Sequence, residues 1–160
     1  MKPVPPLLLS ITFFILTSSC NSENTELQSS QFELPDSGIE ITDAWARPGR
    51  INGVSAIYMN VLNGSAEPDT LISLSSSIAG LVELHETYEL ADDMMGMREA
   101  ENPVFPGRGV VSMQPGGFHI MLMQLNQPLN VGDEVHLVLK FALAGDISVP
   151  VPVQSQSEQN

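Results

Sequence analysis

Histidine and methionine occur at alternate positions in the segment 118–125, which reads FHIMLMQL. In a β-strand, alternate side chains share a face, so His119, Met121 and Met123 would project together. Imidazole and thioether groups that point the same way can both bind a soft ion such as copper(I). Pro and Gly at 115–117 predict a turn that places His119 near a strand end and near solvent. This segment therefore predicts half of a soft-metal site.

A second histidine, His85, is followed by a stretch that is rich in methionine: Met94, Met95 and Met97. The preceding aspartates and Gly96 predict a polar loop with a tight turn rather than a core strand. Packing alone explains exposed methionines poorly, whereas thioether sulfur suits copper(I) and needs no deprotonation to bind it. An apolar patch for a partner protein is the alternative explanation.

The spacing of four of these residues resembles the signature of the PCu(A)C family of periplasmic copper chaperones. In that signature a His is followed twelve positions on by a Met, and a His-x-Met pair comes after a gap of 21 residues. His85, Met97, His119 and Met121 fall in this register. Similar segments, among them DAWARP, VELHE and PGGFHIMLMQL, extend the resemblance over residues 39–145.

The resemblance implies a cupredoxin-like Greek-key β-barrel or sandwich that binds one copper(I) ion through these two histidines and two methionines. It also implies delivery to an extracytoplasmic copper protein, such as the copper A centre of cytochrome c oxidase. Some members have Met directly after the first His, where this chain has Glu86. Some members carry a His- and Met-rich C-terminal extension, which this sequence lacks, so a single site is predicted.

The other candidate residues are expected to support this site or the core. Met94 and Met95 could replace Met97 as a ligand if the loop shifts. His136 lies in an alternating strand without a neighbouring sulfur and is expected at the surface. Packing or support of the ligands is expected from Trp45, Arg47, Tyr58, Met59, Met113 and Met123.

Short strands separated by turn residues must position these side chains. The β-rich runs are 39–48, 54–62, 69–77, 81–90, 109–113, 118–125 and 133–143. Twelve Pro and twelve Gly punctuate the chain, and no run of a dozen residues shows a helical apolar stripe. The pattern predicts an all-β antiparallel sandwich or small Greek-key barrel.

The N-terminus, residues 1–20, predicts an export signal. Lys2 precedes an apolar run that is too short to span a membrane and is typical of a secretory signal peptide. Cys20 ends this segment in a context that resembles a bacterial lipobox, although Thr17 stands where Leu is commoner. We therefore expect cleavage before Cys20 and a lipid anchor on its thiol, which makes the protein a periplasmic or cell-envelope lipoprotein. Ordinary signal cleavage nearby is the alternative.

After the signal we expect a flexible tether over 21–38, a copper-binding β-domain over 39–150 and a disordered tail over 151–160. The formal net charge of −13, with nineteen acidic and six basic residues, argues against binding to nucleic acid. Cys20 is the only cysteine, which excludes a thiolate blue-copper site in the domain. No nucleophile accompanies the histidines, so we do not expect an enzyme. The competing hypothesis is a metal-free adaptor lipoprotein that uses its Met-rich loop for docking.

Overall fold

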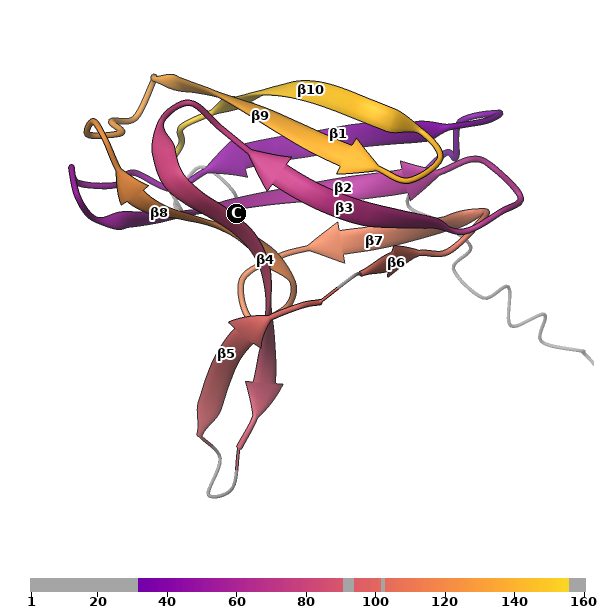
Figure 1. Ribbon diagram of the computed structural model, residues 1–160, viewed down its shortest axis with the longest axis horizontal. Helices are drawn as coiled ribbons and strands as arrows, with labels where there is room; N and C mark the ends of the chain where they lie inside the picture. The colour runs from indigo at the N-terminus through magenta and orange to yellow at the C-terminus, as the bar shows by residue number, and fades with distance from the viewer. Residues whose placement is uncertain (1–31, 91–93, 102, 156–160) are drawn as a thin grey trace, which may run out of the picture. The chain divides into compact units, whose positions relative to one another are not determined.

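The computed structural model describes residues 32–90, 94–101 and 103–155, and within them the chain forms ten β-strands and no helix (Figure 1). The strands are β1 (Ile39–Ala46), β2 (Val54–Asn63), β3 (Asp69–Ser75), β4 (Ala79–Glu89), β5 (Met95–Glu99), β6 (Val104–Phe105), β7 (Gly109–Met113), β8 (His119–Leu125), β9 (Glu134–Phe141) and β10 (Gly145–Pro152). Each pair of neighbouring strands is antiparallel. The expected all-β class is therefore confirmed.

Two sheets make up this sandwich. The larger sheet has the order β1-β2-β8-β4-β5, and the smaller has the order β10-β9-β3-β6. The first half of β2 pairs with β8, whereas its second half pairs with β7 along the same edge. The turn between β7 and β8 consequently lies in the interior of the larger sheet, and it delivers His119 to the middle of that sheet rather than to its rim.

The hydrophobic core lies between the two sheets. Alternation within each strand sends one set of side chains inward, including Ile57 of β2, Leu84 of β4 and Ile120 of β8 from the larger sheet. Leu137 and Leu139 of β9 meet them from the smaller sheet. Residues one position away from these core residues must therefore project from the outer face of the larger sheet.

Three strands differ from the sequence prediction. Residues 95–99, predicted as a loop, form β5 because their backbone pairs with β4 over five registered positions. The two-residue strand β6 was too short to show an alternating pattern. Strand β10 contains Pro150 and Pro152, which cannot donate to a ladder, and it tolerates them because it is the edge strand of its sheet. The sheets form a sandwich rather than a closed barrel.

The folded domain is longer at both ends than the predicted range of 39–150. Gly38 precedes β1 and is already anchored, since its carbonyl accepts a hydrogen bond from the Gly64 amide and its own amide donates to Ser65. Strand β10 continues to Pro152, and the buried Val153 pairs with Ala46. The predicted signal, Cys20, most of the tether and the last five residues lie outside the described residues. In the part of the chain that the structure describes, no helix is long and apolar enough to span a bilayer.

Candidate metal centre

His85 and His119 lie side by side on the outer face of the larger sheet. They are direct partners across the β4–β8 ladder, and their ring centroids are 6.0 Å apart. Metal–imidazole bonds are about 2 Å long, so both rings can reach one ion placed between them. His85 lies inside β4, four residues before its last residue, Glu89. The sequence placed His119 near solvent, but it is only 5% exposed, because the Tyr58 and His85 rings lie on either side of its ring.

Met121 lies two residues beyond His119 on the same face. It pairs with Glu83 of β4 on one side and with Ala56 of β2 on the other. It also packs against the small outer-face cluster of Trp45, Ala56 and Tyr58. The Met121 thioether is therefore held in place by its neighbours before any ligand binds.

Met97 belongs to the same face but is much more accessible. It pairs with Thr87 across the β4–β5 ladder, which makes it a diagonal neighbour of His85. Met121 is the diagonal neighbour of His85 on the opposite side, through its pairing with Glu83. The two expected methionines thus flank the histidine pair on one face, with Met121 half-buried and Met97 63% exposed.

Hydrogen bonds assign a different nitrogen of each ring as the one available to a metal. The Nδ1 atom of His119 lies 3.0 Å from the Gly117 carbonyl oxygen, which can only accept a hydrogen bond. In the neutral ring Nδ1 therefore carries the proton, and Nε2 keeps its lone pair. The Nε2 atom of His85 lies 2.9 Å from Oε2 of Glu83, so His85 keeps its lone pair on Nδ1 instead.

The Gly117 carbonyl connects the turn before β8 to strand β4. Besides its contact with His119, it accepts hydrogen bonds from the amide and the hydroxyl of Thr87, at 3.3 and 3.2 Å. Gly116 adopts a positive φ of 84°, a conformation that favours glycine and lets the turn close. The turn predicted from the sequence thus sets the orientation of the His119 ring.

An aromatic and cationic group borders His119 on the β2 side. The Tyr58 ring centroid is 6.3 Å from that of His119 and 4.8 Å from that of Trp45, and the Arg47 guanidinium lies 5.4 Å over the Tyr58 ring. Burial raises the pKa of Tyr58, and the positive charge of Arg47 partly opposes this effect. Tyr58 is consequently neutral at physiological pH. These contacts fit the packing role expected for Trp45, Arg47 and Tyr58.

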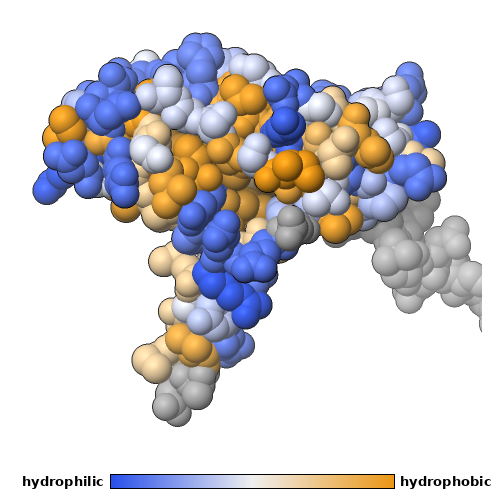
Figure 2. Space-filling view, in the orientation of Figure 1, coloured by the Kyte–Doolittle hydropathy of each residue, from blue (hydrophilic) through white to orange (hydrophobic). Residues whose placement is uncertain are grey.

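The outer part of β4 and strand β5 form a hairpin that extends away from the sandwich (Figure 1). We call its described residues, Glu86–Leu90 and Met94–Glu99, the methionine arm. Figure 2 shows hydrophobic residues near the end of this arm and hydrophilic ones where it leaves the sandwich. Met94, Met95 and Met97 are 58–63% exposed.

The face of the arm opposite to Met97 holds a set of interlocked side chains. The Arg98 guanidinium lies 4.8 Å over the Tyr88 ring, and its Nε donates to Glu86 at 2.6 Å. A Cβ at Gly96 would lie 2.8 Å from the Tyr88 ring, so Gly96 gives this ring room instead of forming the turn that the sequence suggested. The arm is thus stabilised from this face, while Met97 takes no part in the interlock.

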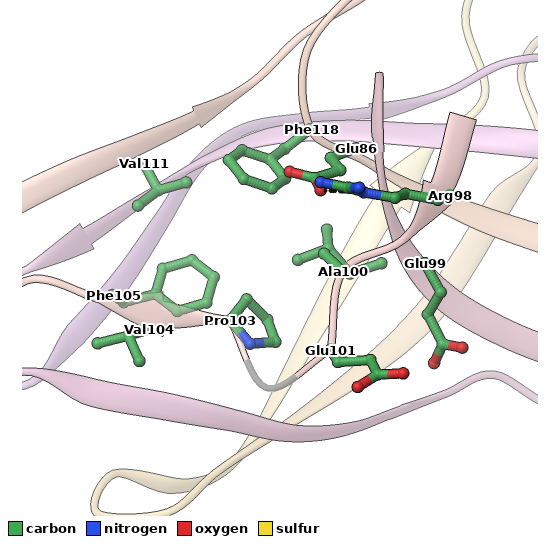
Figure 3. A pocket seen from close by; sticks show the side chains of 11 residues that line it. Glu86, Arg98, Glu99, Ala100, Glu101, Pro103, Val104, Phe105, Val111 and Phe118 are labelled. Carbon is green, nitrogen blue, oxygen red and sulfur yellow. Dashed lines mark hydrogen bonds and ion pairs between the residues drawn. The ribbon is translucent and has the colours of Figure 1, made fainter. Parts of the chain in front are cut away.

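A cavity of about 490 Å³ lies between the arm and the body of the domain (Figure 3). Leu84, Phe105 and Phe118 line it, and the Arg98–Glu86 pair borders it. Leu84 and Glu86 are one residue away from His85 and thus project from the other face of β4. Since the lining contains no His or Met, this cavity is separate from the candidate metal centre.

The remaining candidates lie where the sequence analysis expected them. Met59 and Met113 are buried partners in the β2–β7 ladder. Met123 is half-buried on the outer face, paired with Leu81. The His136 side chain is 71% exposed. Among the described residues no three His, Cys, Asp or Glu side chains form a metal-binding cluster.

Sequence reasoning missed the hydrogen-bonding partners of the two histidines. Glu83 lies two residues before His85, and this spacing in a strand already places both side chains on one face. That signal could have identified Glu83. The role of the Gly117 carbonyl depends on the path of the turn, which residue types alone do not specify.

The family model described as "Putative lipoprotein LpqE-like" matches residues 39–153. The chain belongs to this family. A relative named "Putative lipoprotein Lxx21020", from Leifsonia xyli subsp. xyli, is 31% identical over 124 residues, which cover 77% of this chain and 74% of the relative. An uncharacterised Rickettsia prowazekii protein, RP573, is 29% identical over 133 residues, which cover 79% of this chain and 72% of that protein.

Solved structures confirm the resemblance to PCu(A)C domains. The copper-bound PCuAC domain from PmoF2 is 25% identical with a TM-score of 0.61, covering 78% of this chain and 97% of that domain. The solution structure of copper(I)-bound DR1885 from Deinococcus radiodurans is 28% identical with a TM-score of 0.58, covering 77% and 84%. The LpqE-like chain therefore has the fold of domains that were solved with copper bound.

Proposed function

We propose that this LpqE-like protein is an extracytoplasmic copper(I) chaperone that binds one ion through His85, Met97, His119 and Met121. The observation that carries the proposal is the direct pairing of His85 with His119, flanked diagonally by the two methionines on one face. Two neutral imidazoles and two thioethers form a soft donor set that suits copper(I). The copper-bound relatives of the same fold support this assignment.

The hydrogen bonds described above prepare both rings for the ion. Glu83 and the Gly117 carbonyl each hold the N–H of one ring, which leaves Nδ1 of His85 and Nε2 of His119 to bind copper. Met121, fixed against Ala56 and Tyr58, supplies a sulfur that needs no reordering. Binding therefore costs little conformational entropy at three of the four ligands.

Met97 is the ligand that makes release possible. A chaperone must let the acceptor's ligands approach the ion while the ion is still held, and the most exposed ligand gives that access. We propose an acceptor among extracytoplasmic copper proteins, with the copper A centre of cytochrome c oxidase as the specific candidate. Lipid attachment at Cys20 would hold the protein at the membrane where such acceptors reside.

The test is an anaerobic copper(I) titration of the purified protein against a chromophoric chelator, followed by transfer to a copper-free copper A domain. We expect one tightly bound equivalent, weakened about 100-fold or more in His85→Ala and His119→Ala. His136→Ala, an exposed histidine on the smaller sheet, is the matched control and should bind like wild type. Copper(I) binding that is unchanged in His85→Ala and His119→Ala would refute the site, while tight binding without transfer would refute delivery alone.

A further inference from the structure

Met95 stands out among the residues that the four-ligand site leaves unused. It is 60% exposed in β5, which is an edge strand of the larger sheet. Burial therefore does not explain an apolar side chain at this position. It lies two residues from Met97 in the same strand, so the two side chains share a face. Their Cα atoms are consequently about 7 Å apart, close enough for two flexible thioethers to approach one ion.

The charges around Met95 favour a cation. Its partner across the ladder is Glu89, and Glu99 occupies the same face beyond Met97, opposite His85. The only described cation of the arm, Arg98, is one residue away from Met97 and is engaged on the opposite face by Glu86 and Tyr88. The face that carries the two sulfurs is therefore negative, which raises the local concentration of a positively charged ion.

We propose that Met95 and Met97 form a two-sulfur outer site that captures copper(I) before it reaches the histidine pair. The inference rests on the proposed function and extends it outward along the arm. Met97 is shared: it binds the incoming ion with Met95, then keeps it as His85, His119 and Met121 replace Met95. Met95 and Met97 are both more than half exposed, whereas His119 is 5% exposed, so the path leads from solvent-accessible sulfurs to a buried imidazole.

The neighbouring Met94 provides a matched control. It is 58% exposed and adjacent to Met95, and its backbone carbonyl accepts a hydrogen bond from Leu90, which continues the ladder. Alternation along the chain consequently directs its side chain away from the face of Met95. Met94→Leu and Met95→Leu thus remove the same atom, at similar exposure, from opposite faces.

The first measurement is the rate of copper(I) loading by stopped flow, under anaerobic conditions, in wild type, Met94→Leu and Met95→Leu. We expect Met95→Leu to load several-fold more slowly, with equilibrium affinity for one ion almost unchanged, and Met94→Leu to match wild type. Equal rates in the two variants, whether both slowed or both unchanged, would overturn the proposal.

The second measurement isolates the outer site in the His85→Ala/His119→Ala variant, with silver(I) as a redox-stable probe. Methyl NMR of labelled methionines should show weak binding that shifts the Met95 and Met97 signals, and added Met95→Leu should weaken it about tenfold or more. Silver(I)-induced shifts of the Met94 methyl signal as large as those of Met95 and Met97 would overturn the proposal. Failure of the four-ligand site would instead appear as absent tight binding in wild type, so the two failures are distinguishable.

Discussion

The centre of the larger sheet and the methionine arm use the same residue types under opposite physical conditions. In the sheet centre, His119 lies in a strand with neighbours on both sides, its ring lies beside that of Tyr58, and its Nδ1 hydrogen-bonds to the Gly117 carbonyl. On the arm, Met95 and Met97 face solvent from an edge strand and are more than half exposed. The sheet centre holds its side chains in a fixed arrangement, and the arm exposes its thioethers to solvent.

This difference separates two requirements of a copper carrier. Tight binding needs ligands that are ordered in advance, because ordering them on binding would reduce affinity. Rapid exchange needs at least one ligand that an acceptor can displace. A chain with all four ligands in the sheet centre would hold its ion and exchange it slowly, and a chain with all four on the arm would bind it weakly.

The largest contrast between a buried and an exposed methionine should appear in the stability of the metal-free protein. Met59→Ala removes a 2% exposed side chain from the β2–β7 ladder and should lower the free energy of unfolding by about 2–5 kcal/mol. Met97→Ala should change it by only about 0.5 kcal/mol or less, because the side chain is largely in water already. Urea unfolding monitored by circular dichroism measures both. A comparable loss in Met97→Ala would mean that the arm packs on the body of the domain.

Most of the fold follows from sequence pattern. The seven predicted runs each contain a strand, because alternation of apolar and polar residues with Pro or Gly punctuation directly reflects a half-buried strand. The pairing of β2 with two different strands on one edge does not follow, since it depends on tertiary contacts. Strand β5 was also missed, because an exposed edge strand with Gly96 lacks both a buried face and β-branched residues.

The sequence suggested the residues of the candidate site but not their surroundings. Strand alternation alone predicted that His119 and Met121 share a face, and the family resemblance added His85 and Met97 to the predicted site. The sequence did not predict that His85 and His119 are register partners, because register between distant strands is set by the packing of the whole sheet. For the same reason it could not show that His119 is buried while Met97 is exposed.

A smaller effect is expected from Glu83, which supports the buried region without binding copper itself. Glu83→Ala removes the acceptor at Nε2 of His85 and should weaken copper(I) binding about 10- to 100-fold. Glu83→Gln should lose less copper(I) affinity, since the amide oxygen of the glutamine still accepts the hydrogen bond.

The control for Glu83 is Glu134→Ala, which removes another carboxylate beside a histidine, His136, on the smaller sheet. Nitrogen-15 NMR of the imidazoles adds a readout that simple destabilisation would not change. In Glu83→Ala the His85 ring should lose its preference for a proton on Nε2, and the His119 ring should not change. An unaltered His85 tautomer would show that Glu83 does not orient the ring.

The smallest effect concerns Tyr58, which borders His119, and it appears only at alkaline pH. Because burial raises the pKa of Tyr58 above its ordinary value of 10.0, the unfolded chain loses this proton at lower pH than the folded domain does. The free energy of unfolding should therefore fall as pH rises above about 10, and this fall should be smaller in Tyr58→Phe. Urea unfolding of both proteins between pH 8 and 11 tests this. If the free energy of unfolding has the same pH dependence in both proteins, the surroundings of Tyr58 accommodate its negative charge. That result would weaken the contrast between a buried sheet centre and an exposed arm.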